Sequence, residues 1–226
     1  MTGKIKGKEE VAQGTLQVTF QIDEPFTFQP GQYCFVTLNG EKKQFSINNS
    51  PGQNNIITIT TRLSESSFKK ALKDLPIESE VELGPIAGVF TLPEDTSKPL
   101  VLIAGGIGIT PFMSMLQYVK ESSLTYNITL LYSNRNQASA AFLDELRKLP
   151  KALPNFKLIL TMTEDNSWTG EKRKIDSEFI SEYFPDVNDN LYMVVGPPTM
   201  VEAVEKALLE ARVFRENIKK ENFTGY

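Results

Sequence analysis

A glycine-rich turn directly follows a continuous apolar run in the middle of the sequence. The run Leu100–Ala104 has the composition of a strand buried on both faces, as in a parallel sheet. Gly106 and Gly108 lack Cβ atoms, so a ligand's phosphates could approach the backbone. Pro111 suits the start of a helix, whose N–H groups favour anions. The spacing predicts a phosphate-binding turn. Because the third glycine of the usual fingerprint is absent, close helix–strand packing alone stays an alternative.

Two absences limit the chemistry available to side chains. The sequence contains no histidine and a single cysteine, Cys34. This excludes disulfides within the chain, cysteine-held iron–sulfur clusters, ordinary zinc sites and triads that need a histidine base, so no metal site is expected. The apolar strand pattern around Cys34 predicts a small buried hydrophobe. An enzyme with this composition must use carboxylates, hydroxyls or a bound organic cofactor.

Length and charge restrict the class of protein. The chain has 226 residues, enough for one large or two small domains. Its net charge is -4, without the basic block typical of nucleic-acid binding. The uncharged stretch Pro99–Val119 contains prolines, glycines and polar side chains that argue against a membrane span. The segment Met1–Glu10 has no apolar core typical of a secretory signal, so we expect a cytoplasmic protein.

The first part of the sequence contains short β-type runs separated by turns. Turn signals occur at Gln29–Gly31, Asn39–Gly40 and Ser50–Gly52. A helix is expected at about residues 65–75, because apolar residues recur there at helical spacing. Strands at this spacing predict a small antiparallel β-barrel. The expected strands are Thr15–Ile22, Gln32–Leu38, Gln44–Asn48, Ile56–Arg62 and Glu80–Leu83.

The second part alternates predicted strands and helices, which is typical of a doubly wound α/β sheet with parallel strands. The polar segment Pro93–Pro99 is the expected boundary, giving one domain at residues 1–96 and another at residues 97–226. The expected strands are residues 100–104, 128–133, 157–162, 191–195 and 218–223. The expected helices are residues 111–120, 138–149, 177–183 and 199–210.

Further motifs occur in a fixed order along the chain. They are Pro30–Tyr33, Lys43–Pro51, Gly84–Phe90, Gly196–Met200 and Glu221–Phe223. With a barrel placed before a nucleotide-binding fold, this order resembles the ferredoxin–NADP⁺ reductase superfamily over essentially the whole chain. The resemblance implies an FAD-binding barrel domain in the first part and an NAD(P)-binding, Rossmann-like domain in the second.

The flavin motif of that family has the pattern Arg-x-Tyr-Ser. The resemblance implies that Lys43 pairs with the flavin phosphate, that Phe45 packs against the isoalloxazine ring and that Ser46 faces its reactive edge. Lysine keeps the charge of arginine without its bidentate geometry, and phenylalanine lacks the tyrosine hydroxyl. From the residues alone, an exposed lysine, a core phenylalanine and a turn serine are the favoured alternative. The other implied flavin-binding residues are Ile47, Asn48, Ser50, Thr61, Ser66 and Ser67.

The resemblance assigns the NAD(P)H side of the site to the carboxyl ends of the parallel strands. Ser133 and Arg135 are placed near the ribose 2′ group, where a hydroxyl and a cation favour NADPH over NADH. Val195 replaces a cysteine that many members place beside the nicotinamide. Phe223 is implied to lie against the flavin face, with Tyr226 extending onward over the flavin or its adenine. The remaining implied residues are Gly106, Gly108, Thr110, Pro111, Gly196, Pro197 and Met200.

The activity implied by the resemblance is an NAD(P)H-dependent oxidoreductase reaction. A hydride passes from NAD(P)H to bound FAD, and electrons continue to a small carrier protein such as ferredoxin or flavodoxin. Ser46 and Phe223 are the expected catalytic residues, and the missing histidine fits because this transfer has no obligatory protein base. Two alternatives stay open: an NAD(P)H:flavin reductase that uses free flavin as a substrate, and an electron-transfer subunit of a larger complex.

Overall fold

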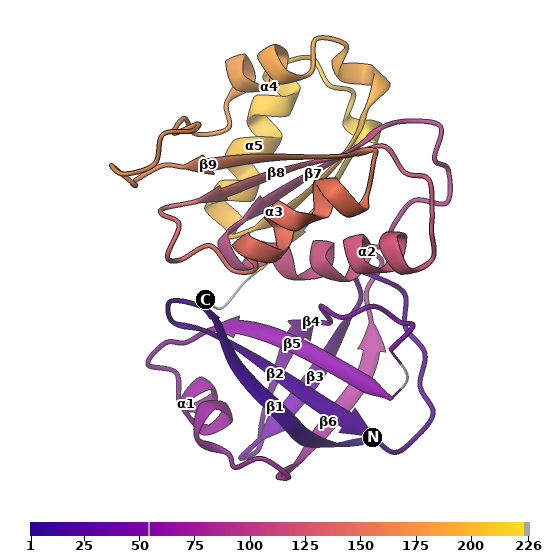
Figure 1. The fold of residues 1–226 in the computed structure, drawn as a ribbon, viewed down its shortest axis with the longest axis vertical. Coiled ribbons are helices and arrows are strands. Elements are labelled where there is room, and N and C mark those ends of the chain that lie inside the picture. Colours follow the sequence, from indigo (N-terminus) through magenta and orange to yellow (C-terminus); the bar gives the residue numbers. More distant parts are fainter. Residues whose placement is uncertain (54, 224–226) are drawn as a thin grey trace. The chain divides into compact units, whose positions relative to one another are not determined.

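The computed structural model describes residues 1–53 and 55–223, which form two compact units (Figure 1). The first unit comprises residues 1–92 and 110–123, and the second comprises residues 93–109 and the chain from residue 124 onward. The break after Leu92 falls beside the polar segment Pro93–Pro99. The helix that follows the glycine turn is grouped with the first unit.

Six antiparallel strands form the sheet of the first unit, in the spatial order β4-β3-β6-β1-β2-β5. An isolated antiparallel bridge joins Ile47, just after β4, to Ile59 of β5, and the Asn48 N–H donates to the Thr58 carbonyl at 2.9 Å. These contacts bring the two edges of the sheet together, so the six strands form the predicted antiparallel, barrel-like sheet. The strands are β1 (Thr2–Ala12), β2 (Thr15–Ile22), β3 (Tyr33–Leu38), β4 (Glu41–Ser46), β5 (Ile56–Arg62) and β6 (Glu80–Ala87).

Alternating side chains of these strands fill the barrel. In β2, Val18, Phe20 and Ile22 are fully buried and alternate with partly exposed residues, the period of two that a half-buried strand requires. Helix α1 (Ser67–Asp74) adds Phe68 to this core. Cys34 is also fully buried, as predicted, and burial raises the pKa of its thiol to about 12. Such a thiol is an inert core residue.

Strand β1 was not predicted, although it spans 11 residues. Five of its 11 residues are charged, and Ile5 is the large apolar side chain that it places in the core. Lys8 has a structural use: its Nζ donates to the carbonyls of Leu72 and Lys73 at 2.8 and 2.7 Å, and also to that of Leu75. These are carbonyls at the end of α1, which a cation caps favourably. The charged strand therefore fixes α1 against the barrel.

The hairpin between β3 and β4 sets the register of the flavin motif. Asn39 and Gly40 have φ values of 51° and 79°, the left-handed pair that a tight two-residue hairpin turn requires. Strand β4 consequently begins at Glu41 and ends at Ser46, three residues earlier at its start than the predicted Gln44. Its exposed first part was missed because it is polar.

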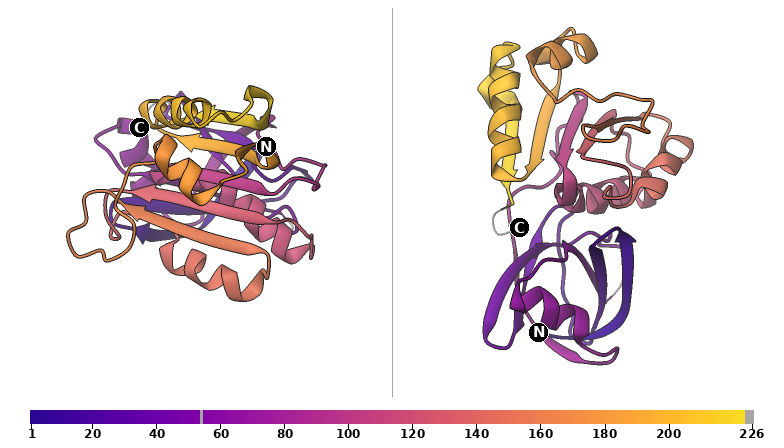
Figure 2. Two further views of the ribbon diagram at one scale, coloured as in Figure 1. Left: turned by 90° about the horizontal axis from the view of Figure 1, so that it is seen from above. Right: turned by 90° about the vertical axis from the view of Figure 1, so that its left-hand side faces the viewer.

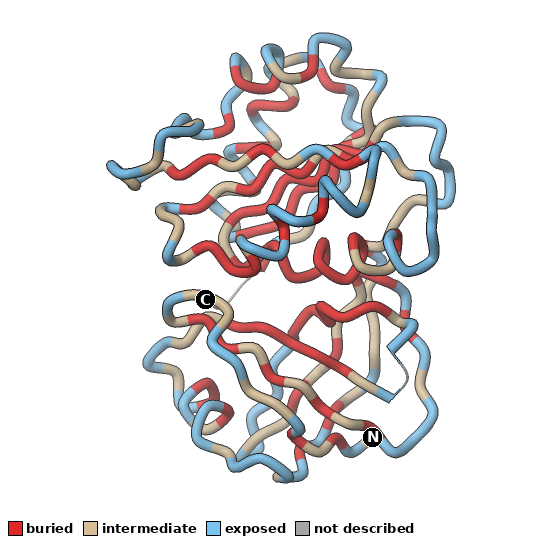
Figure 3. The backbone as a smooth tube through the Cα atoms, viewed as in Figure 1, coloured by how far each residue is buried: buried red, intermediate tan, exposed pale blue. Residues whose placement is uncertain are grey.

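The second unit contains a five-stranded parallel sheet in the order β11-β10-β7-β8-β9, as predicted. Helices α3 and α5 cover its opposite faces (Figure 2). Every residue of β7 is buried (Figure 3), which explains its continuous apolar sequence. The strands are β7 (Leu100–Gly105), β8 (Ile128–Asn134), β9 (Phe156–Met162), β10 (Leu191–Gly196) and β11 (Ile218–Asn222), and the helices are α3 (Leu143–Ala152), α4 (Ser177–Tyr183) and α5 (Pro198–Glu210).

Helices α2 (Ile109–Glu121) and α3 begin at residues other than those predicted. Helix α3 begins at Leu143 rather than at residue 138, because Phe142 has a left-handed φ of 58° and breaks the helical path. Helix α2 begins two residues before Pro111, which therefore lies third in the helix. Proline is tolerated there because N–H groups of the first turn have no acceptor within the helix. In the first unit, the Ser114 hydroxyl of α2 donates to the Asn49 carbonyl at 2.7 Å.

Candidate functional site

Backbone packing defines the glycine turn at the carboxyl end of β7. A Cβ atom added at Gly108 would lie 2.5 Å from the Val195 carbonyl oxygen, and one added at Gly105 would lie 2.9 Å from Met200 Sδ. Gly106 has a φ of 53°, in the left-handed region that favours glycine. Close packing against β10 is therefore one reason for these glycines. The same geometry brings the turn and the start of α5 to one edge of the sheet.

The strand register gathers other predicted residues at this edge. Ser133 of β8 lies beside Gly105 of β7, and Gly196 ends the neighbouring strand β10. Pro197 caps α5, whose first turn contains no acidic residue and whose N-terminus is therefore suited to an anion. The predicted residues Gly106, Pro197, Met200 and Ser133 are at least partly exposed, whereas Gly108, Thr110, Pro111 and Gly196 are buried.

The end of β8 contains a side chain whose importance the sequence did not indicate. Both polar atoms of the Asn134 amide are buried and have no hydrogen-bond partner in the described structure. Buried polar atoms are normally paired, so this amide fits a polar group of a ligand bound at the strand end. Arg135, the next residue, is exposed, and its Nε lies 3.9 Å from Oε1 of Glu164. Glu164 was not predicted either; its carboxylate would suit a bare ribose 2′-hydroxyl.

The end of β11 carries the predicted aromatic residue. The Phe223 N–H donates to the Gly196 carbonyl at 2.9 Å, and its side chain is buried. Glu221, two residues earlier, pairs with Val195 in the strand register. Its Oε2 atom is buried without a hydrogen-bond partner, and burial raises the pKa of the carboxyl to about 7. Tyr226 lies outside the described residues, so its placement over a cofactor stays a prediction.

In the first unit, the flavin motif spans the end of β4 and the loop after it. Phe45 is 4% exposed and stacks on Phe68 of α1, with ring centroids 5.8 Å apart. Ser46 and Ile47 are also buried. Phe45 thus faces the core and α1, the arrangement expected of a core phenylalanine. Its proposed role beside an isoalloxazine ring stays a prediction.

The loop after β4 is held by its own polar side chains. The Thr60 hydroxyl donates to Asn48 Oδ1 at 3.0 Å, and the Thr58 N–H donates to Asn49 Oδ1 at 2.7 Å. The Ser50 hydroxyl, which is buried, accepts from the Gly52 N–H at 3.4 Å. The predicted residues Asn48 and Ser50 therefore fix the backbone of this loop. Asn49 contributes equally, although the sequence did not single it out.

The N-terminus of α1 gathers the charged and hydroxyl groups predicted for the flavin phosphates. Ser66 caps the helix without a side-chain hydrogen bond, and the first turn contains no acidic residue. The Ser67 hydroxyl donates to Glu41 Oε1 at 3.2 Å, and Lys43 Nζ lies 3.9 Å from Glu41 Oε2. Lys69 is 6% exposed; burial and the nearby Lys43 ammonium lower its pKa. Two ammonium groups and two hydroxyls at a helix N-terminus fit a phosphate.

Thr61 lies at the end of β5, before this helix. It is fully buried, and its hydroxyl donates to the Arg62 carbonyl at 3.4 Å.

Among the described residues, no group of three or more histidine, cysteine or acidic side chains is arranged to hold a metal ion. None of the described helices combines the length and apolarity required to cross a bilayer.

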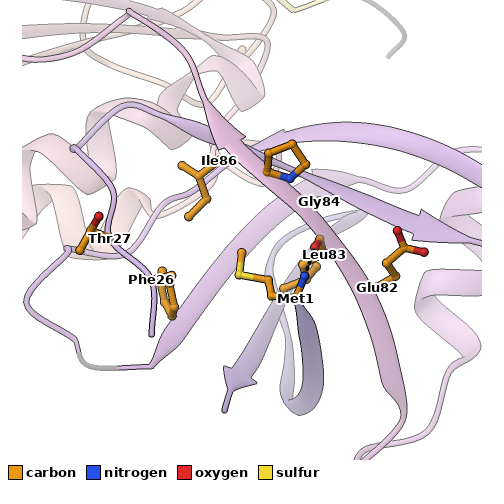
Figure 4. A pocket seen from close by; sticks show the side chains of 8 residues that line it. Met1, Phe26, Thr27, Glu82, Leu83, Gly84 and Ile86 are labelled. Atoms are coloured by element: carbon orange, nitrogen blue, oxygen red, sulfur yellow. Dashed lines mark hydrogen bonds between the residues drawn. The ribbon is translucent and has the colours of Figure 1, made fainter. Parts of the chain in front are cut away.

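An open pocket of about 490 Å³ lies elsewhere in the first unit (Figure 4). It is lined by Met1, Phe26, Thr27 and residues 82–86 of β6, which overlap the Gly84–Phe90 motif but include none of the residues predicted to bind flavin or NAD(P)H. Glu82 and the Met1 ammonium are its charged groups, and the ammonium donates to the Leu83 carbonyl at 3.0 Å. Its lining lacks the clustered cations and hydroxyls found near α1. We therefore place the candidate site at the N-terminus of α1 and at the ends of the parallel strands, and not in this pocket.

Comparison with known proteins also indicates a nucleotide-binding domain in the second part of the chain. Residues 102–206 match the oxidoreductase NAD-binding domain family. The reductase component DmpP of phenol 2-monooxygenase from Pseudomonas sp. (strain CF600) is 28% identical over 210 residues, which cover 90% of this chain and 60% of that protein. The chain thus spans about 60% of that relative's length.

Solved structures share the whole two-unit fold. The flavohem-like FAD/NAD-binding domain of nitric oxide dioxygenase from Vibrio cholerae aligns with a TM-score of 0.88 at 20% identity, covering 98% of both chains. Ferredoxin–NADP⁺ reductase from Plasmodium falciparum aligns with a TM-score of 0.81 at 18% identity, covering 98% of this chain and 95% of that one.

The protein is thus a two-unit chain in which a barrel-like antiparallel sheet precedes a parallel sheet of the nucleotide-binding type. The predicted resemblance is thereby confirmed at the level of the fold: the chain has the fold of ferredoxin–NADP⁺ reductase, and residues 102–206 match the oxidoreductase NAD-binding domain family.

Proposed function

We propose that this chain is an NAD(P)H-dependent flavin oxidoreductase that passes electrons from NAD(P)H, through bound FAD, to a small carrier protein such as ferredoxin or flavodoxin. The observation that carries the proposal is the glycine turn at the end of β7, which lies within the segment 102–206 matched to the oxidoreductase NAD-binding domain family. The named relative is itself a reductase component, and the Vibrio cholerae neighbour is an FAD/NAD-binding domain.

On this proposal, residues 1–96 form the FAD-binding domain. Lys43 and the hydroxyls of Ser66 and Ser67 hold the phosphate groups, where ammonium groups and a helix N-terminus favour negative charge. Ser46 serves at the reactive edge of the flavin, and Asn48 and Ser50 keep the loop beside it rigid. The flavin, when bound, supplies the exchange between two-electron and one-electron transfer that no side chain of this chain can perform.

Residues 97–226 then form the NAD(P)H-binding domain. The turn at Gly106 and Gly108 and the N-terminus of α5 bind the pyrophosphate side of the nucleotide. The buried Asn134 amide hydrogen-bonds the ribose, and Arg135 favours NADPH through the 2′-phosphate. Phe223 covers the flavin face until the nicotinamide displaces it.

The partner and location belong to the same proposal. A carrier protein is consistent with relatives named as reductase components, and we propose that the chain works in the cytoplasm. Carrier binding is expected at a surface of complementary charge.

A second candidate function is favoured by a specific contact. The Glu41 carboxylate already accepts a hydrogen bond from the Ser67 hydroxyl and lies 3.9 Å from Lys43 Nζ. Two groups assigned to the flavin phosphate therefore have a carboxylate partner within the chain. Weakened phosphate binding would suit an enzyme that uses free flavin as a substrate.

The spectrum and activity of the purified protein separate these functions. A yellow protein that keeps its flavin absorbance after desalting and oxidises NADPH with an artificial one-electron acceptor supports the first. A colourless protein that oxidises NADPH only with added flavin supports the second. A protein that neither holds flavin nor oxidises NADPH or NADH with added FAD or FMN contradicts both.

A further inference from the structure

Strand β4 and helix α1 meet through alternate side chains of the strand. Glu41, Lys43 and Phe45 share one face of β4, because side chains of a strand alternate between its two sides. On α1, the Ser67 hydroxyl binds Glu41 and the Phe68 ring stacks on Phe45. The stacked rings anchor this face at one end. Glu41 and Lys43 consequently lie over the N-terminus of α1.

The Glu41 carboxylate has the contacts that an anionic ligand would make there. Its Oε1 accepts the hydrogen bond from the Ser67 hydroxyl at 3.2 Å, and its Oε2 lies 3.9 Å from Lys43 Nζ. The N–H groups of the helix N-terminus add positive potential, with no acidic residue in the first turn. The carboxylate is thus the resident counter-ion of a site whose donors otherwise suit phosphate.

We propose that Glu41 competes with the flavin's phosphate groups for Ser67 and Lys43, and so sets how weakly this chain holds FAD or FMN. The inference rests on the proposed flavin-binding function and names its regulation at the same site. A bound phosphate must displace the Glu41 carboxylate, because two anions cannot share these donors without repulsion.

The degree of exposure sets the size of the effect. The Glu41 and Lys43 side chains are 49% and 54% exposed, so their ion pair is solvent-screened and weak. Glu41 can therefore turn into solvent when phosphate binds, and it reduces affinity without abolishing it. The geometry predicts an effect of a few-fold, confined to ligands that carry phosphate.

The test compares Glu41→Gln with a charge-matched control. Glu65 also lies next to α1, but its carboxylate pairs with Lys70 Nζ at 2.5 Å. Glu65→Gln removes the same charge without touching Ser67 or Lys43. Dissociation constants are measured by fluorescence or calorimetry for FAD, FMN and riboflavin, and for inorganic pyrophosphate alone.

We expect Glu41→Gln to bind FAD, FMN and pyrophosphate about 3–10-fold more tightly than wild type, with riboflavin affinity unchanged. Glu65→Gln should match wild type for every ligand. Equal FAD affinity in wild type and Glu41→Gln, or an equal gain for riboflavin, overturns the competition while leaving flavin binding intact. If neither protein binds any flavin but pyrophosphate binding still tightens in Glu41→Gln, the proposed function fails and the competition at the anion site stands. Absence of both overturns both.

Discussion

The two units hold their candidate sites by different means. In the second unit, the site consists mainly of backbone: the glycine turn packs so closely on β10 that a Cβ atom at Gly108 would lie 2.5 Å from the Val195 carbonyl oxygen, and strand ends fix the neighbouring residues. In the first unit, the candidate phosphate site consists of side chains. The neighbouring Glu41 carboxylate already contacts two of its donors, the Ser67 hydroxyl and the Lys43 ammonium. Backbone sites allow little variation, whereas side-chain sites can be tuned by one nearby charge.

Gly108→Ala should have the largest effect, because it tests the backbone site directly. The new Cβ would meet the Val195 carbonyl oxygen at 2.5 Å, and neither strand nor turn can move cheaply. We expect the free energy of unfolding to fall by about 3–4 kcal/mol in urea titrations, with loss of nucleotide binding. The control is Gly7→Ala in β1, where the nearest atom would lie 3.8 Å away. Equal free energies of unfolding for both variants would show that the close packing of Gly108 against β10 does not limit stability.

Lys43→Ala tests the side-chain site. Removal of a charge-assisted phosphate contact should weaken FAD binding by about 1.5–3 kcal/mol, with little change in stability. Lys70→Ala, at an exposed position paired with Glu65, serves as the control. FAD affinities measured by fluorescence give the answer. If Lys43→Ala and Lys70→Ala bind FAD equally, Lys43 does not contact the phosphate.

Glu221→Gln tests whether a buried carboxyl of the second unit makes stability depend on pH. Burial raises the pKa of Glu221 from 4.5 to about 7, so the folded state keeps the proton that the unfolded state releases. Wild-type stability should therefore decline as the pH rises between these two values, by about 1–2 kcal/mol after allowance for partial solvent exposure.

The glutamine variant does not titrate and should lose this decline, so that above the window it is more stable than wild type. Thermal unfolding across the window, with the exposed Glu202→Gln as a charge control, measures the difference. Parallel pH profiles for wild type and Glu221→Gln would contradict the role of the buried carboxyl.

The smallest expected effect concerns the choice of coenzyme. Arg135→Ala should lower the ratio of kcat/KM for NADPH to that for NADH by about 3–10-fold, because both Arg135 and its partner are exposed. Glu164→Gln should raise the same ratio, since it removes the carboxylate next to Arg135. An unchanged ratio in both variants would show that this pair does not contact the 2′-phosphate.

Elements that depend on apolar periodicity could be predicted from the sequence, whereas features that depend on side-chain contacts could not. The bounds of β2, β5 and α4 were predicted to the residue, and all five parallel strands were found, because apolar periodicity determines them. Strand β1 was missed because it carries charges along most of its length. The start of α3 was missed because a left-handed Phe142 leaves no pattern in the sequence.

The candidate site was predictable where a motif fixes the backbone, as at Gly106 and Gly196. The contributions of Glu41, Lys69 and Asn134 depend on strand register and on which side chains pack nearby. No local pattern reveals such neighbours. The placement of Tyr226 stays a prediction.

The most direct test of the central proposal is an anaerobic titration of the FAD-loaded protein with NADPH and with NADH, followed by absorbance. The proposal predicts that the oxidised-flavin absorbance disappears in proportion to added NADPH, and less readily with NADH. Retention of that absorbance with both coenzymes, while FAD stays bound, would contradict an NAD(P)H-dependent flavin oxidoreductase.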